Sequence, residues 1–256
     1  MSRLSFKLGP ALGHRANMGL IVLRTDETVE AEARQVLTGK GVAHYVSRVP
    51  CHTSVTLEGL ATMEAEIPRA AALLPDEQPY DVVAYACTSG ATSIGSAQVS
   101  AAIRLGANTR HTTDPLAAAL VALGALNVRR LGFVTPYMPD VSDAMRGKLE
   151  AAGFEIAGFG SMEEENDMRV ARIDAPSIRA AILTVCAMAP CDAVFLSCTN
   201  LRALALIPEI EAEVGVPVLT SNSVLLWHMM QLAGQPTGGL PHGALMRTGI
   251  SAHDPA

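Results

Sequence analysis

Two stretches of this chain share one pattern: Asp81–Ser89 reads DVVAYACTS, and Asp192–Asn200 reads DAVFLSCTN. Each stretch begins with an aspartate, continues as an apolar run of strand length, and ends in Cys-Thr followed by a small polar residue. Each residue of the first stretch is separated from its match in the second stretch by the same number of residues. Such a repeat inside equivalent predicted strands indicates two similar halves, related by a pseudo-two-fold axis.

Outward from the repeat, strand-like apolar runs alternate with segments of helical periodicity. Strands are expected at residues 18–24, 43–50, 81–90, 129–137, 154–161, 192–201 and 216–222. This alternation is typical of βαβ units and a parallel sheet. The sequence therefore predicts an α/β fold with two pseudo-symmetric half-domains, each a parallel sheet flanked by helices, and an active site in the cleft between them.

The expected boundaries follow from where the pattern restarts. Residues 1–115 together with 224–256 are predicted to form the first half-domain, and residues 116–223 the second. The helix at 224–234 is thus expected to return to the first half. The segment TTDP before residue 116 is interpreted as a turn, and the Gly/Pro-rich tail after Gly234 as a surface segment or subunit contact.

Both repeated cysteines are expected at the carboxyl ends of their strands, which is where open parallel sheets bind ligands. A helix is predicted to begin directly after each of them, and a helix N-terminus lowers the pKa of a nearby thiol. The neighbouring Thr88, Ser89, Thr199 and Asn200 can donate hydrogen bonds to a carboxylate or to a developing enolate oxygen.

The duplication predicts two thiols, Cys87 and Cys198, on opposite sides of one substrate. One thiolate can remove a proton from, or attack, one face of a carbon while the other thiol returns a proton to the opposite face. Inversion of a stereocentre needs such a pair, whereas a hydrolase needs one nucleophile. Cys51, Cys186 and Cys191 lie outside the repeat and are interpreted as packing residues.

Composition excludes several other classes of protein. The net charge of -6 over 256 residues argues against a nucleic-acid partner. No apolar run is long enough for a membrane span, and no signal peptide is recognised, so a cytoplasmic location with reduced thiols is expected. No phosphate-binding glycine loop, Schiff-base lysine or metal-ligand spacing is found, so no metal, flavin or pyridoxal cofactor is expected. The apolar helix at 224–234 suggests a homo-oligomer.

The motifs ACTSG around Cys87 and SCTNL around Cys198 resemble the paired cysteine motifs of the aspartate/glutamate/hydantoin racemase superfamily. The resemblance covers roughly residues 15–234 and is strongest to the maleate cis–trans isomerase branch. VTPY, which contains Tyr137, and EEEN, which contains Asn166, are similar to that branch's substrate-binding tyrosine and asparagine. The resemblance implies that both hold substrate carboxylates.

Two departures from that branch bear on the substrate. The stretch RTDETVE places Asp26 where the maleate isomerases carry an asparagine, and a carboxylate is a poor partner for a dicarboxylate. Asp26 is therefore expected to bind an amino or amidine group. This form resembles the ectoine-utilisation members, which implies a role in ectoine or hydroxyectoine breakdown. The related arylmalonate decarboxylases carry a small residue at the position of Cys87, so its presence disfavours decarboxylation.

The sequence predicts a cofactor-independent two-cysteine isomerase or racemase that acts on a small carboxylic acid. Three alternative functions stay open. The first is an enzyme that resembles arylmalonate decarboxylase. The second is a non-catalytic small-acid binding protein, which would keep its ligand after loss of both thiols. The third is a redox switch, which would form a reversible disulfide between Cys87 and Cys198.

Overall fold

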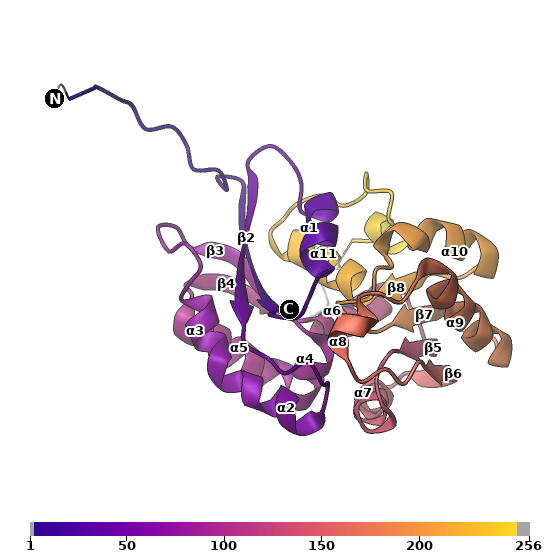
Figure 1. Cartoon of the computed structure of the whole chain (residues 1–256). Coiled ribbons are helices and arrows are strands. Elements are labelled where there is room, and N and C mark those ends of the chain that lie inside the picture. The colour runs from indigo at the N-terminus through magenta and orange to yellow at the C-terminus, as the bar shows by residue number, and fades with distance from the viewer. Residues whose placement is uncertain (1–2, 250–256) are drawn as a thin grey trace.

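Two four-stranded parallel sheets form the core of the protein, which is described here from a computed structural model covering residues 3–249. The first sheet has the order β2-β1-β3-β4, and the second has the order β6-β5-β7-β8. Their strands are β1 (Ala16–Leu23), β2 (Val42–Val49), β3 (Tyr80–Ala86), β4 (Thr109–Thr113), β5 (Arg130–Thr135), β6 (Glu155–Ser161), β7 (Ala193–Leu196) and β8 (Val218–Thr220). The second order repeats the first, and the two sheets form two adjoining lobes (Figure 1). The predicted α/β fold with two pseudo-symmetric halves is confirmed.

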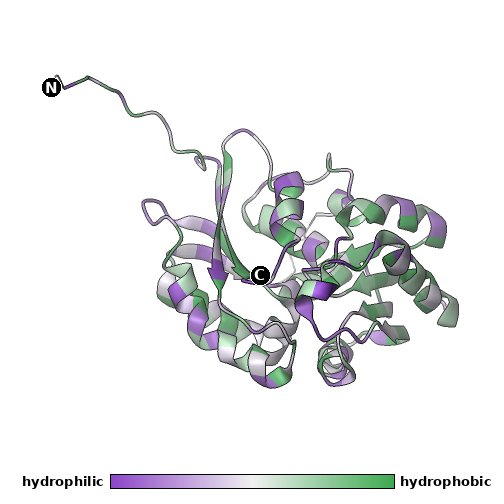
Figure 2. Ribbon diagram, in the orientation of Figure 1, coloured by the Kyte–Doolittle hydropathy of each residue, from purple (hydrophilic) through white to green (hydrophobic). Residues whose placement is uncertain are grey.

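Helices flank both sheets and carry both polar and apolar residues, whereas the central strands are largely apolar (Figure 2). They are α1 (Val29–Val36), α2 (Leu57–Thr62), α3 (Ile67–Ala71), α4 (Thr88–Ile94), α5 (Ser96–Gly106), α6 (Pro115–Ala125), α7 (Pro139–Ala151), α8 (Asp167–Val170), α9 (Ala175–Met188), α10 (Ile207–Val214) and α11 (Ser221–Leu232). Three short 3-10 segments occur at Met63–Glu66, Leu204–Leu206 and Leu245–Arg247. Over residues 3–249, every helix is too short or too polar to cross a membrane.

The strand β4 was not predicted, because the segment before Pro115 was interpreted as a turn. Its sequence TRHTT pairs in parallel with β3 at the edge of the first sheet. All five of its residues are threonine, histidine or arginine, so the strand has no apolar run to mark it. β-branched threonines suit a strand without making it hydrophobic, and hydropathy alone therefore missed it.

The sequence pattern also predicts a helix over residues 57–74, kinked or broken at Pro68, and a helix over residues 93–106. The observed boundaries differ at both places. The helix expected to break at Pro68 breaks earlier, at the 3-10 segment, and Pro68 lies in the first turn of α3, where a missing N–H costs nothing. The helix expected at residues 93–106 is divided at Gly95, whose φ of +99° suits glycine. Its first part, α4, already begins at Thr88.

The closing helix α11 packs against α6, α1 and the strands β3 and β4 of the first sheet. Its ten residues from Ser221 to Met230 are all buried. Trp227 Nε1 donates a 2.8 Å hydrogen bond to the carbonyl of Thr248, and Leu245 and Met246 in the tail are buried as well. The tail is therefore part of the core and not only a surface segment. Residues 1–2 and 250–256 of the predicted first half-domain lie outside the described residues.

Gly106 ends α5 where this helix approaches α3, and it provides a test of the packing. A Cβ atom at Gly106 would lie 2.0 Å from the carbonyl oxygen of Pro68, whereas one at Gly147 in α7 would meet nothing within 4 Å. We expect Gly106→Ala to destabilise the fold by about 2–3 kcal/mol through overpacking. Gly147→Ala should stabilise it by up to about 1 kcal/mol through helix propensity. Urea unfolding of both variants measures the difference, and equal effects would contradict the packing described.

Candidate active site

Cys87 lies between the end of β3 and the start of α4, and its side chain caps that helix. Its Sγ accepts a hydrogen bond from the backbone N–H of Gly90 at 3.2 Å and lies 3.6 Å from Ser89 Oγ. The nearby hydroxyl of Tyr85 donates to Met63 Sδ at 3.6 Å. Cys87 is only 3% exposed. The thiol is thus held in a buried, largely hydrogen-bonded position beside a helix N-terminus.

Cys198 follows β7 by one residue and has a strained backbone. Its φ is +138°, a value that residues other than glycine rarely adopt and that occurs most often at functional sites. Its N–H donates to Ser221 Oγ at 2.9 Å, and its Sγ accepts from the N–H of Asn200 at 3.3 Å. The prediction that a helix begins directly after Cys198 is wrong. A turn follows instead, in which Asn200 hydrogen-bonds to residues 25–28 of the first half, and helical structure begins only at Leu204–Leu206.

A narrow pocket with a free volume of about 20 Å³ lies between the two halves and is lined by both cysteines. Its wall is made by Leu23, Cys51, His52, Ser54, Val55, Gly59, Leu60, Met63, Cys87, Ser89, Tyr137, Asp167, Cys198 and Thr199. The lining residues come from the carboxyl end of β1 and from the segments that follow β2, β3, β5, β6 and β7. The repeat in the sequence is therefore brought together in space around one cavity.

Five of the nine predicted site residues line this pocket: the two cysteines, Ser89, Tyr137 and Thr199. Tyr137 is 2% exposed, and its hydroxyl lies near the Cys198 thiol. Burial raises the pKa of the Tyr137 hydroxyl well above its ordinary value, so it is a hydrogen-bond donor. These five residues combine two thiols with three hydroxyl groups.

Thr88 and Asn166 are not among the lining residues and are engaged elsewhere. Thr88 Oγ1 donates a 2.7 Å hydrogen bond to Ser221 Oγ, which ties α4 to the start of α11. Asn166 Oδ1 accepts from the N–H groups of Met168 and Arg169 and caps α8. In this structure both side chains position helices, and their predicted contact with substrate stays a prediction.

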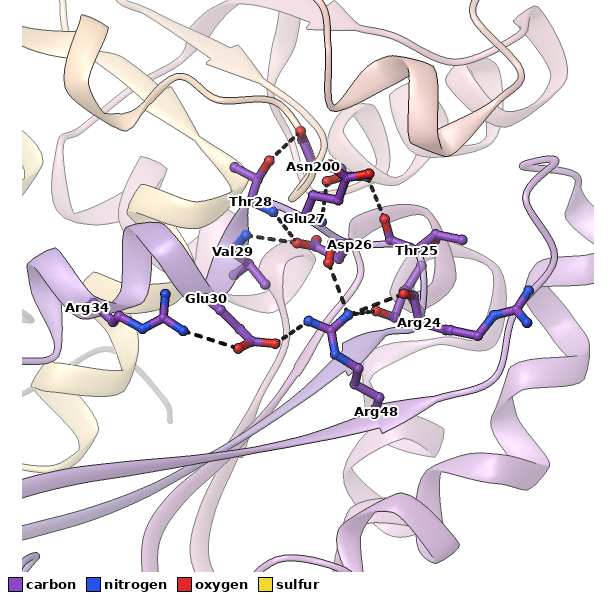
Figure 3. Close-up of polar contacts among 11 residues, drawn as sticks. Arg24, Thr25, Asp26, Glu27, Thr28, Val29, Glu30, Arg34, Arg48 and Asn200 are labelled. Atoms are coloured by element: carbon purple, nitrogen blue, oxygen red, sulfur yellow. Dashed lines mark hydrogen bonds and ion pairs between the residues drawn. The ribbon is translucent and has the colours of Figure 1, made fainter.

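Asp26 and Asn200 are also not among the lining residues, and they brace the turn between β1 and α1 (Figure 3). Asp26 Oδ1 accepts from the N–H groups of Thr28 and Val29, both at 2.8 Å. Asn200 Oδ1 accepts from the N–H of Glu27, while its Nδ2 donates to the carbonyl of Thr25. These bonds join the turn of the first half to the Cys198 turn of the second half.

Three residues of the pocket wall with titratable side chains were not predicted as site residues: Asp167, Cys51 and His52. Asp167 directly follows Asn166 and is 5% exposed, and its Oδ2 accepts a 2.5 Å hydrogen bond from Thr25 Oγ1. Cys51 Sγ lies 3.3 Å from the same hydroxyl. The EEEN motif marked the right segment, but no pattern in one sequence tells which of two adjacent polar residues faces a cavity.

Comparison with known proteins places this arrangement in a family. The family model described as arylmalonate decarboxylase matches residues 18–246. The chain belongs to the arylmalonate decarboxylase family. Within it, the chain is 33% identical to an arylmalonate decarboxylase from Bordetella bronchiseptica over 118 residues, which cover 46% of this chain and 49% of that protein.

Maleate isomerases are also among the relatives of this chain. The chain is 27% identical to the maleate isomerase from Nocardia farcinica over 241 residues, which cover 90% of this chain and 95% of the relative. A solved structure of a Nocardia farcinica maleate cis–trans isomerase variant, with a covalently bound succinylcysteine intermediate, superposes with a TM-score of 0.82. It is 26% identical and covers 91% of this chain and 98% of that one. A crystal structure of arylmalonate decarboxylase superposes with a TM-score of 0.71 at 25% identity. The match covers 91% of this chain and 99% of that one.

The pKa values of both pocket thiols are raised, so the thiols are neutral. This contradicts the prediction that a helix N-terminus lowers the pKa of each thiol. Burial raises the pKa of the Cys87 thiol to about 12, against the smaller lowering effect of Ser89 and the Gly90 N–H. Burial also raises the pKa of the Cys198 thiol well above its ordinary value, and the Asp167 carboxylate adds to this. Loss of solvation outweighs one or two hydrogen bonds.

Raised thiol pKa values predict a distinct alkylation profile. We expect iodoacetamide to modify Cys87 and Cys198 slowly at pH 7 and about tenfold faster per pH unit, still rising at pH 9.5, because only the thiolate reacts. A free cysteine, with a pKa of about 8.5, levels off by then. Peptide mass spectrometry of timed samples measures each site. A plateau near neutral pH at either cysteine would contradict the prediction.

The side chains around the pocket offer few metal ligands. Among residues 3–249, no three histidine, cysteine, aspartate or glutamate side chains cluster with the spacing of a metal site. The groups present on the wall are two central thiols, hydroxyls, the Asp167 carboxyl and the outer pair Cys51 and His52. This set suits proton transfer and thiol addition to a small acid.

Proposed function

We propose that this protein is a cofactor-independent isomerase or racemase that acts on a small carboxylic acid through Cys87 and Cys198. The observation that carries the proposal is that two buried thiols, one from each repeated motif, line a single pocket. A pair of acid–base groups on one small cavity is the arrangement that inversion or cis–trans isomerisation requires. The maleate isomerases among the relatives support the isomerase assignment.

For cis–trans isomerisation, one cysteine adds to the double bond of an unsaturated acid. A C–S bond forms as the π bond breaks, and the other cysteine delivers its proton to the neighbouring carbon. Rotation about the new single bond, return of that proton and cleavage of the C–S bond then give the other isomer. The succinylcysteine intermediate of the Nocardia farcinica relative is an adduct of this kind. No proton or electron is gained or lost overall.

For racemisation, one thiolate removes the proton from the carbon beside the carboxylate, and the opposite thiol protonates the resulting enolate on its other face. The Tyr137, Ser89 and Thr199 hydroxyls, which line the pocket, would hold the carboxylate. Because burial keeps both thiols neutral, a thiolate has to be generated after substrate binds. Three groups that hydrogen-bond to the two sulfurs are available to stabilise it: the N–H groups of Gly90 and Asn200 and the Ser89 hydroxyl.

Arylmalonate decarboxylation is the second candidate, and it is favoured by the family model and by the Bordetella bronchiseptica relative. Loss of CO₂ leaves a carbanion that needs a single proton donor. A decarboxylase would use only one of the two thiols in the pocket, so isomerisation is the better-supported activity. The sequence resemblance to ectoine-utilisation proteins adds ectoine and hydroxyectoine to the acids to be tested.

Proton NMR in deuterated buffer tests the proposal directly. Maleate, aspartate, glutamate, ectoine, hydroxyectoine and phenylmalonate would each be incubated with the enzyme. We expect conversion of one acid to its isomer, or uptake of deuterium at the carbon beside its carboxylate. Release of CO₂ from phenylmalonate alone would identify a decarboxylase instead. Ligand binding without any exchange would move the protein to the class of non-catalytic small-acid binding proteins.

A further inference from the structure

The Asp167 carboxyl group is a feature of the pocket that two-thiol chemistry does not use. Asp167 begins α8, is 5% exposed and lies on the pocket wall with Cys87 and Cys198. Thr25 Oγ1 donates to its Oδ2, and the charge of this carboxylate raises the pKa of both thiols. The carboxyl group is therefore close enough to both sulfurs to contact the same small ligand.

The pocket wall contains no cation to balance this carboxylate. Its lining includes no lysine or arginine, and His52 is exposed at the rim. The nearby guanidinium groups are committed to other partners: Arg24 donates to the carbonyl of Cys51, and Arg48 pairs with Glu30. Among residues 3–249, the ion pairs found leave Asp167 out.

A second acid deepens the imbalance. Asp26 is 4% exposed, and its Oδ2 has no hydrogen-bond partner in the described structure. Burial raises the pKa of Asp26, and repulsion between the negative charges of Asp26 and Asp167 adds to this effect. A ligand with two carboxylates would add like charge to this side of the pocket, whereas a ligand with a positive group would relieve it.

We propose that Asp167 determines the substrate class by pairing with a cationic nitrogen, an ammonium or amidinium group, on a small carboxylic acid. The inference rests on the proposed function, because it takes the pocket of the two thiols as the substrate site. The carboxylate of such a substrate would face the Ser89, Tyr137 and Thr199 hydroxyls, and its cationic end would face Asp167. Dicarboxylates without a positive group would be selected against.

This pairing also links binding to thiol activation. The Asp167 carboxylate disfavours a thiolate at either cysteine. A cation bound to Asp167 would cancel that repulsion while the substrate is in place. The substrate with a positive group would thus favour formation of the thiolate that attacks it, and an unsuitable dicarboxylate would not.

Two matched pairs of ligands test the assignment by isothermal titration calorimetry. Aspartate and succinate differ by one ammonium group, as do β-alanine and propionate. For the wild type we expect at least tenfold tighter binding of the amino member of each pair. In Asp167→Asn, whose amide oxygen can still accept from Thr25, that preference should fall at least tenfold, and succinate should bind as well or better. Asp174→Asn is the control, because this exposed aspartate caps α9 and asparagine caps equally well.

The opposite pattern would overturn the proposal. If Asp167→Asn weakens succinate and leaves aspartate unchanged, Asp167 is a protonated donor to a carboxylate. If the wild type shows no preference within either pair, or binds none of the four, the selection does not exist. Asp167→Glu keeps the charge and should retain the preference even at lower affinity. Deuterium uptake is recorded separately, so a preserved preference without exchange would refute the isomerase assignment and leave the role of Asp167 standing.

Discussion

Cys87→Ser and Cys198→Ser should each lower turnover of the true substrate by about 10²–10⁴-fold, because a hydroxyl is far harder to ionise than a thiol. The double variant should lose little more than either single variant, since the two thiols act as one unit. Each single variant should still catalyse one half-reaction. For a racemase, this means residual deuterium exchange from one enantiomer only, and NMR of the two enantiomers offered separately measures it.

The matched control for these variants is Cys191→Ser. Cys191 is half-buried, precedes β7 and lies outside the pocket lining. Its replacement should leave turnover within about twofold of the wild type. Full activity of Cys87→Ser or Cys198→Ser would refute two-thiol catalysis, and circular dichroism would confirm that each variant keeps the fold.

Glu32→Ala should destabilise the protein by about 3–5 kcal/mol, the largest loss of stability expected from a single polar side chain here. Glu32 lies in α1 and is 6% exposed. Its Oε1 accepts from the N–H groups of Ala203 and Leu204, and its Oε2 accepts from Asn222 Nδ2 at 2.7 Å. Truncation would leave the buried N–H groups of Ala203 and Leu204 without an acceptor between the two halves. It would also leave one amide hydrogen of Asn222 unpaired, since Nδ2 still donates to the carbonyl of Thr199. Urea unfolding at pH 6 measures the loss.

The matched control is Glu32→Gln, which keeps the shape of the side chain and should lower the free energy of unfolding by less than Glu32→Ala does. The introduced amide can donate to Asn222 Oδ1, which has no partner in the described structure. Burial raises the pKa of Glu32 to about 7 from 4.5, so its stabilising contribution is full below pH 4.5 and is lost as pH rises through 7. The stability of the wild type relative to Glu32→Gln should therefore fall by about 3 kcal/mol between pH 4 and pH 8. A difference that does not change with pH would contradict the raised pKa.

The sequence alone predicted the fold class, because each half repeats the same order of strands and helices. The apolar strands β1, β3, β5 and β7 are buried on both faces and read as continuous hydrophobic runs. The strand β4 escaped prediction because an edge strand with polar residues has no such run. The closing helix α11 was predicted, but its apolar face proved to be covered by the chain's own core.

The sequence by itself determined that two Cys-Thr turns follow equivalent strands, since local pattern and repetition are properties of the chain. Tertiary structure decided which polar side chains reach the cavity: Asp167 does, whereas its neighbour Asn166 caps α8. It also decided the protonation of the thiols, because solvation depends on every atom packed around a group. A helix N-terminus can be read from a sequence, but the burial that raises the pKa of Cys87 to about 12 arises only when the two halves close around it.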